Sequence, residues 1–243
     1  MAVMFGRVRL DGRIPRIAVP FRDGVTEAQV AEARRAGMDI AELRIDHFAD
    51  CTPQHVLEVV RRFGGTPVLA TIRSQAEGGK WTAPEKERAA LFEDILPAVD
   101  AIDIELSSSS ILTRVVDAAR AAKKPVVVSH HNFENTPSLD FLDSIANRAR
   151  ASGADIVKVA ALTASPDDVQ TLVQFTLRHR EKGVLAIGMG DTGMATRIFF
   201  PLLGSLFTFA SFGEGTAAGQ LSLEETAGLL QTFYPSRSLA DKG

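Results

Sequence analysis

Length, composition and charge fit one sizeable globular unit and exclude several classes of function. The chain has 243 residues, of which 45% are hydrophobic and 23% are charged. The formal net charge of −3 provides no broad positive field that would hold nucleic acid or anionic lipid. Cys51 is the only cysteine, so no intrachain disulfide can form. The N-terminus lacks a secretory pattern, and no apolar run approaches the ~20 residues of a membrane span. We therefore expect a cytoplasmic protein without nucleic-acid or membrane partners.

Short segments rich in Val, Ile and Leu alternate along the chain with segments of helical periodicity, which is the pattern of repeated βα units. The predicted strands are 16–20, 38–46, 67–73, 101–106, 125–133, 156–162, 184–190 and 206–212. The predicted helices are 26–36, 53–63, 84–97, 108–122, 138–151, 166–181, 194–203 and 222–232. Thr26, Thr52 before Pro53 and Ser165 before Pro166 are the predicted N-caps of three of these helices.

Eight such units fill the chain without a linker or a break in composition. This pattern predicts an α/β protein with a single domain over residues 1–243, a closed (β/α)8 TIM barrel, which needs roughly 250 residues. An open doubly wound sheet is the second possibility. Strand 206–212 is the least defined, because its sequence could also continue the preceding helix.

Polar residues interrupt five successive predicted strands, whose side chains should be apolar on both faces in such a barrel. They alternate with aliphatic residues, so they share one face of each strand. Because active sites of this fold lie at the C-terminal ends of the strands, we expect these side chains to converge there. The residues are Glu42, Arg44, Asp46, Thr71, Arg73, Asp103, Glu105, Ser129, His131 and Lys158.

Lys158 is the only one of seven lysines within a predicted strand. Its sequence neighbours Val157 and Val159 are apolar, and loss of solvent favours the neutral amine, which is the nucleophile that forms imines. A structural lysine paired with a carboxylate is the alternative. His130 and His131 are adjacent in a strand, so they point to opposite faces. We expect His131 to face the lumen and to act as a base beside Lys158.

Two glycine-rich segments follow the last predicted strands. Residues 188–193 match GxGxxG, but a dinucleotide-binding fold needs further βαβ units after this motif, so we interpret the match as fortuitous. Arg197 follows it and is placed to hold a carboxylate or phosphate. Residues 212–220 are polar and glycine-rich, which suits a mobile lid or an ordinary loop. Metal-ligand patterns such as CxxC and HExxH do not occur, and we expect no metal or cofactor.

Together these residues make the chain closely similar to the type I 3-dehydroquinate dehydratases. The matching segments are Glu42-Leu43-Arg44-Ile45-Asp46, Arg73 with Glu77-Gly78-Gly79, Asp103-Ile104-Glu105-Leu106, Ser129-His130-His131-Asn132-Phe133, Ala154-Asp155-Ile156-Val157-Lys158, Met189-Gly190 with Thr196-Arg197, and Thr216-Ala217-Ala218-Gly219-Gln220. Thr196 and Thr216 stand where the family has serine, and Ala218 stands where the lid has proline.

The resemblance implies dehydration of 3-dehydroquinate to 3-dehydroshikimate in the shikimate pathway, without a cofactor and in a homodimer. Lys158 would form the imine and His131 would be the general acid and base, with Glu77 and Glu105 orienting or stabilising the imidazole. The resemblance implies substrate binding by Glu42, Arg44, Arg73, Met189, Arg197, Thr216 and Gln220. The alternatives are another imine-forming barrel lyase, such as a sugar-phosphate aldolase, and a barrel that binds ligands without catalysis.

Overall fold

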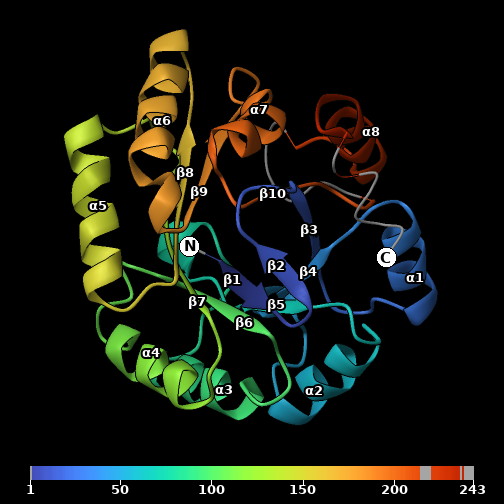
Figure 1. Ribbon diagram of the computed structural model, residues 1–243. Coiled ribbons are helices and arrows are strands. Elements are labelled where there is room, and N and C mark those ends of the chain that lie inside the picture. Colours follow the sequence, from blue (N-terminus) through green and yellow to red (C-terminus); the bar gives the residue numbers. More distant parts are fainter. Residues whose placement is uncertain (1, 214–219, 236, 238–243) are drawn as a thin grey trace.

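A computed structural model describes residues 2–213, 220–235 and 237, and within them eight parallel strands form a nearly closed barrel surrounded by helices (Figure 1). The barrel strands are β3 (Arg16–Phe21), β4 (Ile40–Arg44), β5 (Val68–Thr71), β6 (Ala101–Glu105), β7 (Val126–Asn132), β8 (Ile156–Leu162), β9 (Val184–Met189) and β10 (Phe207–Phe209). They pair in the order β10, β3, β4, β5, β6, β7, β8, β9. At the remaining seam, the Leu206 N–H donates to the Val184 carbonyl at 3.0 Å. The predicted (β/α)8 barrel is confirmed.

The outer layer consists of α1 (Glu27–Arg35), α2 (Pro53–Arg61), α3 (Glu85–Ile95), α4 (Leu112–Ala121), α5 (Leu139–Ala151), α6 (Pro166–His179), α7 (Thr196–Leu203) and α8 (Leu223–Phe233). Three of these helices begin at the predicted caps. Thr26, Thr52 and Ser165 each accept a hydrogen bond from the backbone N–H three residues on, and Pro53 and Pro166 occupy the first helical position.

Two 3-10 turns follow strands at their C-terminal ends, and the first of them shortens a predicted strand. The predicted strand 38–46 ends at Arg44, because residues Ile45–His47 form the turn η1. The prediction that Asp46 shares a strand face with Glu42 and Arg44 is therefore wrong, because Asp46 lies in the turn. The second turn, η2 (Gln75–Glu77), follows β5 and carries Glu77. A third, η3 (Arg180–Lys182), follows α6 at the opposite end of the barrel.

The N-terminal ends of the barrel strands form the lower end of the lumen. A hairpin that the strand pattern did not predict closes this end. Strands β1 (Val3–Phe5) and β2 (Val8–Leu10) pair antiparallel. Phe5 and Leu10 are fully buried and belong to the same apolar cluster as Leu69, Ile156 and Phe207, which point into the barrel. Among the described residues, the polar side chains of the cavity therefore lie towards the C-terminal ends of the strands.

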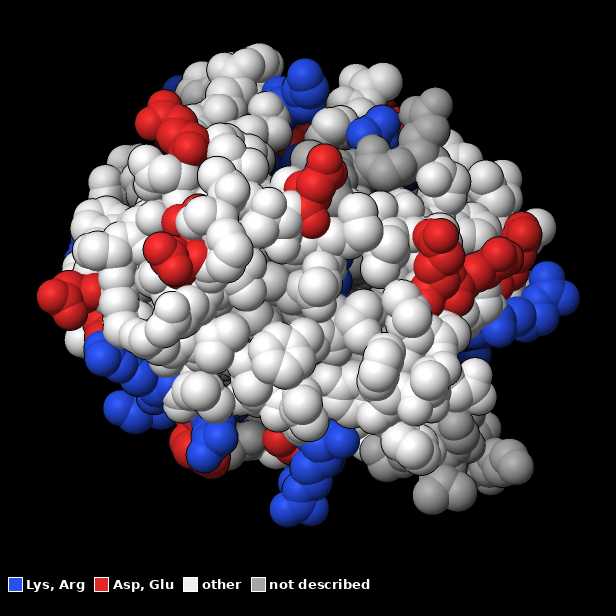
Figure 2. Space-filling view, turned by 90° about the horizontal axis from the view of Figure 1, so that it is seen from above, with Lys and Arg blue, Asp and Glu red and all other residues white. Residues whose placement is uncertain are grey.

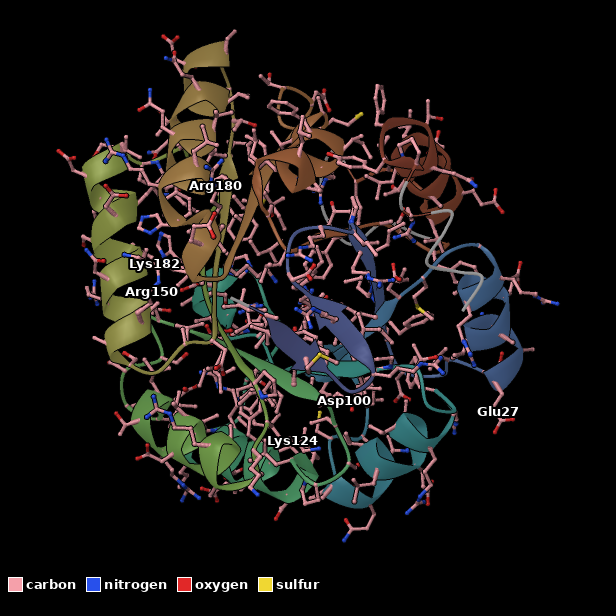
Figure 3. All side chains as sticks on the ribbon, in the orientation of Figure 1. Glu27, Asp100, Lys124, Arg150, Arg180 and Lys182 are labelled. Atoms are coloured by element: carbon pink, nitrogen blue, oxygen red, sulfur yellow. The ribbon has the colours of Figure 1, made fainter. Side chains whose placement is uncertain are left out.

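Acidic residues fasten the strands together at this lower end. Asp39, Asp100 and Asp155 each precede a strand and accept a backbone N–H from the start of the preceding strand, at 2.9 Å in all three cases. Asp100 is labelled in Figure 3, close to the hairpin. These bonds satisfy backbone donors that the parallel ladder leaves open.

The molecular face over α6, α7 and α8 carries few charges at its centre, and Lys, Arg, Asp and Glu lie mainly around its margin (Figure 2). Four of the exposed large hydrophobic side chains belong to α7 and α8, namely Phe199, Leu202, Leu229 and Phe233. Among the described helices, none is long and apolar enough to cross a membrane.

Candidate active site

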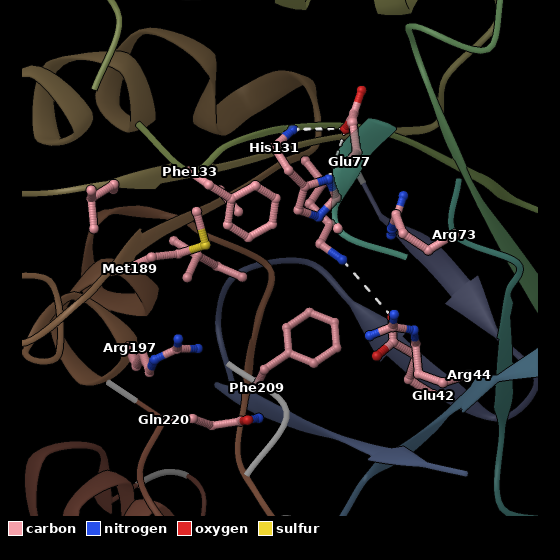
Figure 4. A pocket seen from close by; sticks show the side chains of 15 residues that line it. Glu42, Arg44, Arg73, Glu77, His131, Phe133, Met189, Arg197, Phe209 and Gln220 are labelled. Atoms are coloured by element: carbon pink, nitrogen blue, oxygen red, sulfur yellow. Dashed lines mark hydrogen bonds and ion pairs between the residues drawn. The ribbon is translucent and has the colours of Figure 1, made fainter. Parts of the chain in front are cut away.

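A cavity of about 320 Å³ opens at the C-terminal ends of the strands (Figure 4). It is lined by Glu42, Arg44, Arg73, Glu77, Gly78, His131, Phe133, Lys158, Ala160, Leu162, Ile187, Met189, Arg197, Phe209 and Gln220. The structure thus brings together the residues expected at the site, apart from two. Thr216 lies outside the described residues. Glu105 is fully buried behind Arg73 and accepts a hydrogen bond from its Nη1 at 3.0 Å.

Lys158 projects from the middle of β8 and is 5% exposed. Its Nζ lies 2.9 Å from Oδ2 of Asp103, 3.9 Å from Oε1 of Glu42 and 4.6 Å from the ring centroid of Phe209. The amine is thus enclosed by side chains that lie across the lumen from β8. Val157 and Val159, invoked from the sequence, pack in the outer core instead.

A chain of buried charges with alternating sign extends from Lys158 to the helix layer. Asp103 pairs with Arg73 Nη2 at 2.9 Å, Arg73 pairs with Glu105, and Glu105 Oε2 accepts from Nη1 of Arg88 at 2.8 Å. Burial would raise the pKa of Asp103, but Arg73 and Lys158 together hold that pKa well below its usual range. Asp103 is therefore a fixed anion beside Lys158.

His131 lies on β7, the strand adjacent to Lys158, and faces the same cavity. Oε2 of Glu77 is 2.9 Å from His131 Nδ1 and also accepts the His131 backbone N–H at 2.8 Å. Burial lowers the pKa of His131 well below its usual value, and the positive charges of Arg73 and Lys158 lower it further. The imidazole is thus neutral at pH 7, and an Nδ1–H directed at Glu77 leaves the lone pair on Nε2.

His130 and the two glutamates expected near His131 differ in their contacts. His130 points away from the lumen, as expected, and its ring lies 6.1 Å from that of Phe141 on α5. Glu77 contacts the catalytic candidate His131, whereas Glu105 hydrogen-bonds to Arg73, Arg88, Ser108 and the Ser74 N–H. Glu105 therefore faces these partners, and Glu77 is the glutamate that contacts the imidazole.

Two arginines stand on opposite sides of the cavity (Figure 4). Asp46 binds Arg44 through two hydrogen bonds of 2.9 and 2.8 Å and accepts the Lys80 N–H at 3.0 Å, so η1 fixes the guanidinium. Arg197 lies near the start of α7 and is 3% exposed, and burial lowers its pKa to about 10. It remains a cation at neutral pH and can bind an anionic group.

The GxGxxG segment builds the turn that precedes Arg197. A Cβ added at Gly193 would lie 2.4 Å from the Gly188 carbonyl carbon, so the two segments pack without side chains between them. Thr196 Oγ1 donates to the Gly193 carbonyl at 2.6 Å and accepts the Gly188 N–H at 3.0 Å. The hydroxyl of Thr196 thus holds the turn.

Within the described residues, no cluster of three or more His, Cys, Asp or Glu could hold a metal ion.

The fold and the cavity define a (β/α)8 barrel with an amine and a neutral imidazole in its lumen. Residues 18–237 match the family described as type I 3-dehydroquinase, and the chain belongs to this family of enzymes. It is 40% identical over 212 residues to the 3-dehydroquinate dehydratase of Methanothermobacter thermautotrophicus, covering 87% of this chain and 92% of the relative. The relative from Methanococcoides burtonii is 39% identical over 201 residues, covering 81% and 85%.

Solved structures agree with this assignment. The 3-dehydroquinate dehydratase of Geobacillus kaustophilus HTA426 superimposes with a TM-score of 0.90 at 30% identity and covers 97% of both chains. The type I enzyme of Clostridium difficile gives a TM-score of 0.88 at 26% identity, covering 97% of this chain and 98% of the other. The family match sets aside the aldolase and the non-catalytic barrel that the sequence left open.

Proposed function

We propose that this protein dehydrates 3-dehydroquinate to 3-dehydroshikimate in the shikimate pathway through an imine on Lys158, with His131 as general base and acid. The relatives named above support the substrate and the reaction. The observation that carries the chemistry is the position of Lys158 and His131 on adjacent strands, both facing one cavity. An amine and a base so placed can act on adjacent carbons of one ligand.

The reaction begins when the neutral amine of Lys158 attacks the C3 carbonyl of the substrate. Loss of that oxygen as water gives a protonated imine, which withdraws electrons and acidifies the C2 hydrogen. His131 Nε2 takes the C2 proton, and the resulting imidazolium returns it to the departing C1 hydroxyl, which leaves as water. Hydrolysis of the imine consumes one water and releases the product, so the net change is loss of one water molecule.

The remaining residues of the cavity bind and orient the substrate. Arg197, with Gln220 and Thr216, holds the carboxylate, while Glu42, Arg44 and Met189 contact the ring and its hydroxyls. Arg73 borders the cavity and also fixes Asp103 and Glu105. Positioning of this kind can supply a large part of the rate enhancement, because the reacting groups need no further search.

Borohydride reduction in the presence of 3-dehydroquinate tests the two central assignments separately. The native protein should gain the mass of a reduced adduct on Lys158, and His131→Ala should still form the adduct while losing ~10²–10⁴ in turnover. Lys158→Ala should form no adduct. Lys80 is an exposed lysine at the same end of the barrel, so Lys80→Ala serves as the control and should behave like the native protein. Native turnover in His131→Ala, or trapping in Lys158→Ala, would require other residues for these roles.

We also propose that the protein is a cytoplasmic homodimer that pairs through the face of α7 and α8. A twofold axis brings a surface against itself, so a charge-poor surface avoids repulsion between like charges. Phe199, Leu202, Leu229 and Phe233 would lose their exposure there. Light scattering should give twice the chain mass for the native protein and for the control Phe141→Glu, on α5 outside this face, but a monomer for Leu202→Glu. A native monomer would refute the dimer.

A further inference from the structure

The carboxylate of Glu77 is held by three chain segments. It lies in η2, after β5, and its Oε2 accepts the backbone N–H of His131 on β7 and lies 2.9 Å from Nδ1 of the same residue. The third segment is the turn after β6, from which Ser107 donates its hydroxyl to Glu77 Oε1 at 2.5 Å. Ser107 itself is exposed and does not line the cavity, so it is not among the residues that contact a ligand there.

The charge of Glu77 determines which nitrogen of His131 is the base. An ionised carboxylate can only accept, so it requires Nδ1–H and leaves the lone pair on Nε2. A protonated Glu77 would donate to Nδ1 instead and place the imidazole proton on Nε2, where a base is needed. The general base therefore depends on a charged Glu77.

Ionisation of Glu77 is opposed by its surroundings. The side chain is 5% exposed, and burial raises its pKa. Three neighbours lower the pKa of Glu77, namely Ser107, Arg73 and the His131 N–H. The negative charge of Glu105 raises that pKa further. Arg73 is already shared between Asp103 and Glu105. Ser107 thus provides a hydrogen bond to Glu77 that a substitution can remove, whereas the His131 N–H belongs to the backbone.

We propose that Ser107 is a positioning residue for the reaction, which keeps Glu77 ionised and turned towards His131. The inference rests on the proposed role of His131 as the base. Ser107→Ala removes one hydrogen bond to a carboxylate. At a solvent-exposed position this loss corresponds to a shift of roughly 0.5–1 pH unit in the ionisation of Glu77.

The experiment measures kcat/KM against pH for the native protein, Ser107→Ala, Ser107→Thr and Ser110→Ala. In Ser107→Ala the acid limb should move to higher pH, with a loss of about threefold to tenfold on that limb and recovery towards native activity at alkaline pH. Ser107→Thr retains the hydroxyl and should restore the native profile. Ser110, an exposed serine of the same segment, provides the matched control and should leave the profile unchanged.

A double-mutant comparison isolates the route of action. Glu77→Gln cannot ionise, so adding Ser107→Ala to it should cause no further change. A Ser107→Ala profile that superimposes on the native one would overturn the proposal, as would a loss that is equal at every pH and persists beside Glu77→Gln. Native turnover in His131→Ala would refute the base itself, and this outcome is scored without any Ser107 variant.

Discussion

Arg88 offers a direct test of the buried charge chain. It is fully buried on α3, and its guanidinium donates to the Ile72 carbonyl at 2.9 Å, to Glu105 at 2.8 Å and to Ser108 at 2.5 Å. Arg88→Met keeps most of the side-chain volume and removes the charge. Breaking a buried pair from one side costs about 3–5 kcal/mol, because the remaining ion has lost its counter-charge.

The structure places the expected cost near the lower end of that range. Glu105 keeps Arg73, the Ser74 N–H and Ser108 as partners after the substitution, so its carboxylate is only partly deprived. We expect the free energy of unfolding to fall by about 3 kcal/mol, measured from the urea midpoint at an unchanged slope. Arg114→Met is the control, since Arg114 and Glu93 form a pair on the surface, and its midpoint should not move measurably. Equal midpoints for the two variants would refute the reasoning.

Two further predictions concern substrate binding and acid stability. Arg197→Met should raise KM about tenfold or more while leaving the unfolding midpoint near its native value, because a carboxylate loses a charge-assisted partner; an unchanged KM would remove Arg197 from the site. Burial lowers the pKa of both His131 and His179, the second of which lies between Arg150 (labelled in Figure 3) and Asp143. The unfolded chain therefore binds these protons more readily, so stability should be full above the unfolded histidine pKa of about 6.5 and should decline as the pH falls below it. Thermal unfolding at pH 5 and pH 7.5 measures this, and His179→Gln should reduce the decline; a native midpoint that rises on acidification would contradict it.

The order of strands and helices could be predicted because its signals are local. Apolar runs and caps such as Thr26 and Ser165 act within a few residues of their own position. The hairpin β1–β2 gave no comparable signal, since three residues are too few to establish an alternation. Its place in the fold depends on contacts with Phe207 and Ile156, which are far away along the chain.

The sequence predicted those site residues whose type was unusual at their position. It could not predict which residues pair with one another in space. A lysine within an apolar strand drew attention to Lys158, although Val157 and Val159 point the other way and do not desolvate it. Asp103 stood out as a buried acid, but its pairing with Lys158 spans two strands of the barrel and has no sequence signature. Ser107 is an ordinary turn serine until the Glu77 carboxylate is seen beside it.

The hairpin at the base of the barrel has a consequence for biosynthesis. Residues 3–10 are made before the barrel strands, yet the ring of Phe5 lies 6.0 Å, between centroids, from that of Phe207, which is made some two hundred residues later. Arg237, close to the other end of the described chain, donates to the Pro15 carbonyl and pairs with Asp39 at 2.9 Å. Contacts so distant in sequence form slowly, because a long loop must close before they contribute. During synthesis the apolar side chains of the hairpin therefore lack their native partners until β10 has been made. In that interval they are exposed surface of the kind that chaperones bind.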